Sequence, residues 1–231
     1  MAVAQSGPGV GELVAINLAR VIDTPPPVRG RQDVKPVKTG IDKWPATGPV
    51  AVRRLGVRGD TICDTVHHGG EDQAVYAYAE EDADWWQHEL AGQIRVRLRS
   101  GAFGENLTTR GVDVTGAVIG ERWRIGGTIL QVSSPRIPCS TFAAYWGVDQ
   151  LIKRFIAAGR PGAYLRVLTE GEVSAGDPIT VLDRPAHGLT IAQTLRALTG
   201  EHSLAAMLVA APELPVGARQ QAERWLAAAD R

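Results

Sequence analysis

Cys139 combines a reactive side chain with surroundings that favour its reactive form. It lies in the stretch SSPRIPCSTF, residues 133–142, directly after Pro138 and just before an expected helix. A helix N-terminus favours a thiolate over a thiol, and Arg136 would add a positive charge to the same turn. A thiolate is the form that binds soft metals. The alternative is that Cys139 is a small buried apolar side chain, which is the usual role of a free cysteine.

Two histidines and two glycines form a second candidate. His67 and His68 directly precede Gly69 and Gly70, and the glycines predict a turn. In such a turn an imidazole either hydrogen-bonds to backbone or faces an anion that the glycine amides approach. Cys63 lies at a zinc-ligand spacing from His67, but a structural zinc site requires four ligands and the sequence offers no second pair. We therefore do not expect zinc here.

Two further groups of side chains could bind a polar or anionic ligand. After Gly104, Glu105 and Asn106 either form a solvated turn or hydrogen-bond the edge of a polar ligand. A basic group near the N-terminus would bind phosphate if its members converge, and would otherwise be an ordinary charged surface. Its members are Lys38, Thr39, Lys43, Arg53, Arg54 and Arg58.

The composition is that of an ordinary soluble protein. Hydrophobic residues make up 44% and charged residues 22%, and 25 basic side chains balance 25 acidic ones, so no global field would attract nucleic acid or anionic lipid. The sequence has no signal peptide and no apolar run near the roughly 18 residues of a membrane span. We therefore expect no nucleic-acid or membrane partner and a cytoplasmic location, where Cys63 and Cys139 stay reduced.

The motifs of several common enzyme classes are missing. The sequence contains no GxSxG, no P-loop, no GxGxxG after a strand and no HExxH. These absences argue against the common hydrolases, NTPases, dinucleotide-binding enzymes and zinc proteases.

Alternating apolar residues predict a strand-rich body. The clearest signal is GERWRIGGTILQVSS, in which Gly126 and Gly127 separate two alternating runs and predict a tight hairpin. Further strands are expected at 11–19, 48–57, 74–78, around Leu107, and at 163–171 and 177–183.

Helices are expected both within this body and after it. Residues 80–90 should form an amphipathic helix with Trp85 and Trp86 in the core, and shorter helices should follow at 141–146 and 150–158. Beyond a boundary near Pro185, three helices are expected at 190–199, 203–211 and 215–229. The proline-rich segment 23–43 is expected to be a long loop at the rim of a site.

Four blocks of the sequence resemble the MOSC domain, the molybdenum cofactor sulfurase C-terminal domain, in its stand-alone bacterial YiiM-type branch. They are DTVHHGGEDQAVYAY, RSGAFGENLTT, IGERWRIGGTILQVSSPRIPC and PGAYLRVLTEGEVSAGDPITVL. The resemblance covers residues 11–184, and the helical tail is similar to the three-helix extension of that branch. It implies a mainly β, α+β fold: a β-barrel with inserted helices in residues 1–184 and a small helical subdomain in residues 185–231.

The resemblance also implies a molybdenum cofactor, held by a pterin dithiolene and a protein cysteine. Cys139 occupies the matching position as metal ligand, and His68, next to the glycines, is carried over as a catalytic residue, whereas Cys63 matches no motif and is expected to be structural. The implied cofactor-binding residues are Lys38, Arg58, His68, Gly69, Gly70, Gly104, Glu105, Asn106, Arg136 and Cys139.

The implied activity is reduction of small N-hydroxylated substrates, such as hydroxylaminopurines or amidoximes. The sequence has no flavin or iron–sulfur signature, so electrons would come from a separate reductase containing one of these groups. The alternative is a non-catalytic carrier of cofactor or of sulfur on Cys139. Sulfur delivery in the sulfurase context uses a pyridoxal-phosphate desulfurase domain, for which this chain has no room. The helical tail could serve as a docking surface or join a homodimer.

Overall fold

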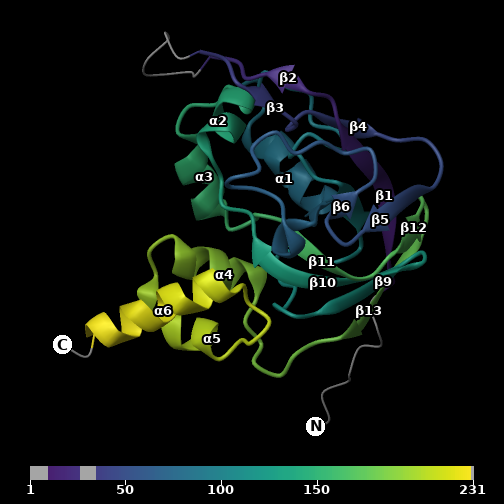
Figure 1. The fold of residues 1–231 in the computed structure, drawn as a ribbon. Coiled ribbons are helices and arrows are strands. Elements are labelled where there is room, and N and C mark those ends of the chain that lie inside the picture. The colour runs from purple at the N-terminus through teal and green to yellow at the C-terminus, as the bar shows by residue number, and fades with distance from the viewer. Residues whose placement is uncertain (1–9, 27–34, 230–231) are drawn as a thin grey trace.

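The centre of the protein is a closed β-barrel (Figure 1). The computed structural model describes residues 10–26 and 35–229. Within them, seven strands follow one another in the order β13-β9-β10-β11-β7-β8-β1, and pairing of β1 with β13 closes the ring. The barrel strands are β1 (Val10–Ala19), β7 (Val75–Ala79), β8 (Leu107–Arg110), β9 (Arg122–Ile125), β10 (Thr128–Pro135), β11 (Ala163–Thr169) and β13 (Pro178–Asp183). Closure leaves no free sheet edge in the barrel, and the expected mainly β, α+β barrel is confirmed.

Alternation along the strands fills the barrel with apolar side chains. Leu13, Trp123, Leu130, Leu165 and Ile179 have no exposed surface. Neighbouring strands are antiparallel except β7 and β8, which run parallel. The connection between these two strands accordingly runs through a helix rather than a tight turn.

The predicted hairpin at the double glycine is confirmed. Ile125 pairs with Thr128, so Gly126 and Gly127 are the two turn residues. Gly126 has φ +51°, and a Cβ there would lie 2.6 Å from the carbonyl oxygen of Glu172. Any larger residue at position 126 would require neighbouring atoms to move. Strand β10 follows the hairpin and ends at Pro135, after which the chain leaves the barrel.

Three helices contribute to a second core that is rich in aromatic rings. They are α1 (Glu80–Glu89), α2 (Ser140–Trp146) and α3 (Leu151–Ala158). Trp86 is fully buried and stacks on Phe155 with ring centroids 5.6 Å apart. Trp85 is only half-buried and packs against the Arg160 guanidinium, so the prediction of a core position is confirmed for Trp86 alone.

The N-terminal segments are more ordered than the sequence suggested. The expected loop 23–43 begins and ends in strands, because β2 (Ile22–Asp23) pairs with β3 (Lys38–Thr39) and β4 (Lys43–Pro45) pairs with the end of β1. Residues 27–34 of that loop lie outside the described residues. The expected strand 48–57 is two strands, β5 (Val50–Arg53) and β6 (Gly56–Val57), which form a small sheet with β12 (Gly171–Val173).

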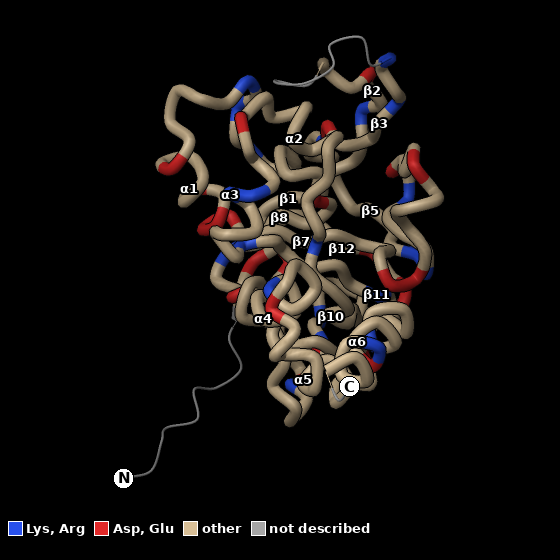
Figure 2. Tube along the Cα trace, turned by 90° about the vertical axis from the view of Figure 1, so that its left-hand side faces the viewer, with Lys and Arg blue, Asp and Glu red and all other residues tan. Residues whose placement is uncertain are grey.

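The C-terminal helices α4 (Ile191–Leu198), α5 (Ala205–Val209) and α6 (Val216–Ala229) lie close to their predicted bounds. A capping box between Thr190 and Gln193 starts α4. Buried residues from all three helices, among them Ile191, Leu208 and Ala222, belong to the same hydrophobic core as the barrel. No helix in the described residues is long and apolar enough to cross a membrane. Acidic and basic residues are interspersed along the chain (Figure 2).

Candidate functional site

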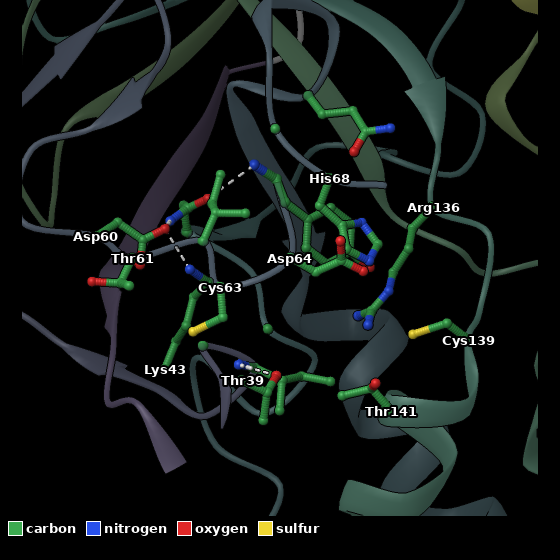
Figure 3. A pocket seen from close by; sticks show the side chains of 18 of the residues that line it. Thr39, Lys43, Asp60, Thr61, Cys63, Asp64, His68, Arg136, Cys139 and Thr141 are labelled. Carbon is green, nitrogen blue, oxygen red and sulfur yellow. Dashed lines mark hydrogen bonds and ion pairs between the residues drawn. The ribbon is translucent and has the colours of Figure 1, made fainter. Parts of the chain in front are cut away.

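A cavity of about 180 Å³ lies where the loops before and after several barrel strands meet. Figure 3 shows Arg136 and Cys139 on one side of it and Lys43, Asp60 and Cys63 on the other. The residues that line it are Val37, Lys38, Thr39, Gly40, Ile41, Lys43, Asp60, Thr61, Ile62, Cys63, Asp64, His68, Gly69, Gln73, Ala74, Tyr76, Gly104, Asn106, Arg136, Cys139, Thr141 and Tyr164.

Cys139 is half-buried in this pocket and is ionised at neutral pH. Burial alone would raise the pKa of its thiol, but a hydrogen bond from His68 and the charge of Arg136 outweigh burial and lower the pKa to about 6. The backbone amide of Phe142 contributes in the same direction, although the sulfur makes no capping hydrogen bond of normal geometry. The thiolate therefore depends mainly on two side chains and less on the helix start.

Arg136 is a buried cation that forms no ion pair with a carboxylate in the described residues. It is 6% exposed, donates a hydrogen bond to the carbonyl of Phe103, and its guanidinium lies 4.3 Å from the ring centroid of Phe142. Burial would lower the pKa of Arg136, but interaction with neighbouring groups, Cys139 among them, raises it. Its charge is therefore available to the Cys139 thiolate and to an anionic ligand.

His67 and His68, which directly precede the turn at Gly69 and Gly70, have different surroundings. Gly69 and Gly70 both have positive φ, +87° and +77°. His68 lines the pocket and helps to lower the pKa of Cys139, whereas His67 is exposed and its Nδ1 lies 2.9 Å from Asp64. Gly69 also lines the pocket, and Gly70 does not. The turn thus gives the two adjacent imidazoles different partners.

Glu105 fits neither of the alternatives that the sequence left open. It is 1% exposed and is not part of the pocket lining, because its carboxylate accepts hydrogen bonds from the amides of Gly101 and Phe103 and from the Thr108 hydroxyl. Burial raises the pKa of Glu105, against the effect of these donors. Glu105 organises its own loop instead of forming a solvated turn.

Asn106 and Gly104 do line the pocket. The Asn106 carboxamide accepts a hydrogen bond from the Tyr76 amide at 3.2 Å and donates one to Asp60 at 2.8 Å. Both ends are therefore bound to the protein, which fixes the orientation of the side chain. Gly104 has φ +77° and a Cβ there would lie 3.3 Å from Ile41, so the loop passes closely under the pocket wall.

The predicted basic group converges only in part. Lys38 and Lys43, with Thr39, line the pocket. Lys38 is exposed and pairs with Asp23 at 3.0 Å, whereas Lys43 is buried and pairs with Asp60. Burial lowers the pKa of Lys43, and the attraction of Asp60 offsets this only partly. The remaining members lie elsewhere: Arg53 pairs with Glu170, Arg54 pairs with Glu71, and Arg58 lines a separate surface hollow.

Several pocket residues were not identified from the sequence. Tyr76 and Tyr164 occupy strands whose alternation could have indicated a shared face, and Gln73 follows the double-glycine turn. Cys63, expected to be structural, is an exposed free thiol on the pocket wall. In the described part of the chain, no three histidine, cysteine or acidic side chains cluster closely enough to hold a metal ion by themselves.

The fold and the pocket define a class of protein: a closed barrel that presents an ionised cysteine beside a buried arginine. A family model described as the MOSC domain matches residues 64–180, a range that includes His68 and Cys139. The chain belongs to the MOSC domain family, which confirms the resemblance seen in its sequence blocks.

Individual relatives agree with this family. Uncharacterized protein YflK of Bacillus subtilis (strain 168) is 38% identical over 159 residues, 69% of this chain and 70% of YflK. A protein named Reductase from Gibberella moniliformis is 30% identical over 181 residues, 78% of this chain but 32% of the fungal protein. The crystal structure of YiiM from Geobacillus stearothermophilus covers 94% of this chain and 99% of its own, with a TM-score of 0.73 and 29% identity.

Proposed function

We propose that this protein is a molybdenum-cofactor-dependent reductase of N-hydroxylated compounds and that Cys139 ligates the metal. One observation carries the proposal: Cys139 lines the pocket together with the buried Arg136, whose charge helps to lower the pKa of the thiol to about 6. A thiolate is the soft ligand that such a metal centre requires. Membership of a molybdenum cofactor-associated family supports the same assignment, as does the fungal relative named Reductase.

The pocket's chemistry fits a pterin cofactor with a phosphate group. Arg136 is a buried cation without a carboxylate partner in the described residues and is able to bind an anionic group, whereas Lys43, on the opposite side, is paired with Asp60. The Oε1 atom of Gln73 is buried and has no hydrogen-bond partner in the described residues, so an N–H group of a ring would satisfy it. Among the residues expected from the sequence, Lys38, His68, Gly69, Gly104, Asn106, Arg136 and Cys139 line the pocket.

When bound, the cofactor would supply two-electron chemistry that removes an oxygen atom. The balance is R–NH–OH + 2e⁻ + 2H⁺ → R–NH₂ + H₂O, with electrons delivered by a separate flavin or iron–sulfur reductase. The chain's part is to hold the metal through Cys139 and to supply protons. His68 is half-buried at the pocket wall, so its imidazole would donate a proton towards the leaving oxygen and recover one from solvent.

The test is an assay of protein purified from a host that makes the cofactor. With a reduced viologen as electron donor, the wild type should convert 6-N-hydroxylaminopurine to adenine, and Cys139→Ala should lose both bound molybdenum and activity. Cys63→Ala removes the other thiol of the same pocket and is the matched control, expected to retain molybdenum. Protein that carries molybdenum but is inert would instead support the cofactor-carrier function, and protein without molybdenum would contradict both the reductase and the cofactor carrier.

A further inference from the structure

Three of the four tyrosines in the chain use their hydroxyl groups within the protein. Tyr76, Tyr78 and Tyr145 donate to a backbone carbonyl or a carboxylate at 2.7, 3.0 and 2.7 Å. The hydroxyl of Tyr164 makes no hydrogen bond within residues 10–26 and 35–229, and it is not among the sealed, unpartnered polar atoms. Because this hydroxyl is accessible from the pocket and is not bonded within the protein, it is available to a ligand there.

The ring of Tyr164 is fixed in the wall of the pocket. Tyr164 lies on β11, which pairs with β7 and β10, and its ring packs against Tyr76 with centroids 5.1 Å apart. Tyr164 lines the pocket together with Arg136 and Cys139. A phenol is a hydrogen-bond donor at neutral pH, because its ordinary pKa is about 10.

A protonated phenol at this position is a hydrogen-bond donor facing the space beside Cys139. In the reaction proposed above, substrate and product differ by one oxygen atom, and that oxygen is a good acceptor that the amine product lacks. A fixed donor beside the thiolate would therefore recognise the substrate in preference to its product. A site that leaves such a donor unpaired binds the deoxygenated compound less well.

We propose that the Tyr164 hydroxyl donates a hydrogen bond to the oxygen of the N-hydroxyl group and so positions the N–O bond beside Cys139. This inference rests on the proposed reductase function and adds the residue that distinguishes substrate from product. Tyr164 is a positioning and specificity residue in this assignment, and proton delivery stays with His68.

Calorimetry on oxidised, cofactor-loaded protein, without an electron donor, tests the inference. The probes are 6-N-hydroxylaminopurine and adenine, and the variants are Tyr164→Phe and the control Tyr78→Phe. Tyr164→Phe should weaken binding of the N-hydroxylated base about 3–10-fold, the effect of one uncharged hydrogen bond, and should not weaken adenine binding. Tyr78 is buried outside the pocket lining, so its variant should lower the thermal midpoint without changing either affinity.

An equal loss of affinity for both bases in Tyr164→Phe, or no loss for either, would overturn the inference. The viologen assay separates this from failure of the proposed function. Wild-type turnover with unchanged Tyr164→Phe kinetics contradicts the role of Tyr164 alone. A wild type that neither carries molybdenum nor turns over contradicts the reductase function and the Tyr164 inference with it.

Discussion

His68 and Cys139 line the same pocket, and His68 helps to lower the pKa of the Cys139 thiol, although the two residues lie on opposite sides of the β9–β10 hairpin in the sequence. His68 lies next to the turn at Gly69 and Gly70 and lines the pocket. Strand β10 ends at Pro135, and Cys139 follows it on the wall of the same pocket. Neither segment alone accounts for an ionised cysteine. The segments that contain His68 and Cys139 must therefore meet in one pocket for the Cys139 thiol to be ionised.

The first prediction concerns the reactivity of Cys139 in protein purified without cofactor. In a Cys63→Ala background, alkylation by iodoacetamide should follow the thiolate fraction and rise with pH around a midpoint near 6, because the pKa of Cys139 is lowered to about 6. Cys139→Ala in the same background gives the blank rate. A midpoint near that of an ordinary thiol would contradict the structure.

The second prediction separates the two histidines. His68→Asn should raise the pKa of Cys139 and slow alkylation at pH 6.5 by about tenfold, since a hydrogen bond to a charged group is lost. His67→Asn is the matched control: it removes only an exposed pair with Asp64, and the alkylation profile should be unchanged. Equal effects of the two substitutions would contradict the assignment of the effect on Cys139 to His68 alone.

The strands and helices were largely predictable from the sequence because they follow local rules. Alternation predicts β1 and β11, and Gly126 with Gly127 predicts the hairpin, since Gly126 has a positive φ that favours glycine. The pocket depends on contacts between distant segments, which local patterns do not encode. Lys43 and Arg58 look alike in sequence, yet Lys43 is buried against Asp60, whereas Arg58 is exposed on another surface.

Glu105 illustrates the same limit. Its neighbours Gly104 and Asn106 line the pocket, but its own side chain turns into the loop. In an irregular loop, neighbouring side chains can point in opposite directions. No periodicity predicts which residue of such a loop faces the ligand. The family resemblance placed the segment at the site without resolving the roles within it.

The third prediction follows from this arrangement. Glu105→Ala should lower the free energy of unfolding in urea by at least about 2 kcal/mol, because the buried Gly101 and Phe103 amides and the Thr108 hydroxyl lose their acceptor. Arg58→Ala, at an exposed position, should change it by less than about 0.5 kcal/mol. Glu105→Ala with unchanged stability would contradict the structural role.

The fourth prediction concerns the buried pair on the far side of the pocket. Lys43→Met leaves the Asp60 carboxylate without its cation and should cost about 3 kcal/mol of unfolding free energy, near the lower end for a broken buried pair because Ala19 and Asn106 still donate to Asp60. Adding Asp60→Asn should recover part of this loss. A double variant less stable than Lys43→Met would contradict this account of the pair.

X-ray absorption at the molybdenum edge would show whether the Cys139 sulfur is bound to the metal, as proposed. Wild-type and Cys63→Ala protein should show the same number of sulfur neighbours around the metal. Cys139→Ser protein that retains cofactor should show one sulfur fewer and a light-atom neighbour in its place. An identical sulfur count in Cys139→Ser and wild-type protein would contradict the claim.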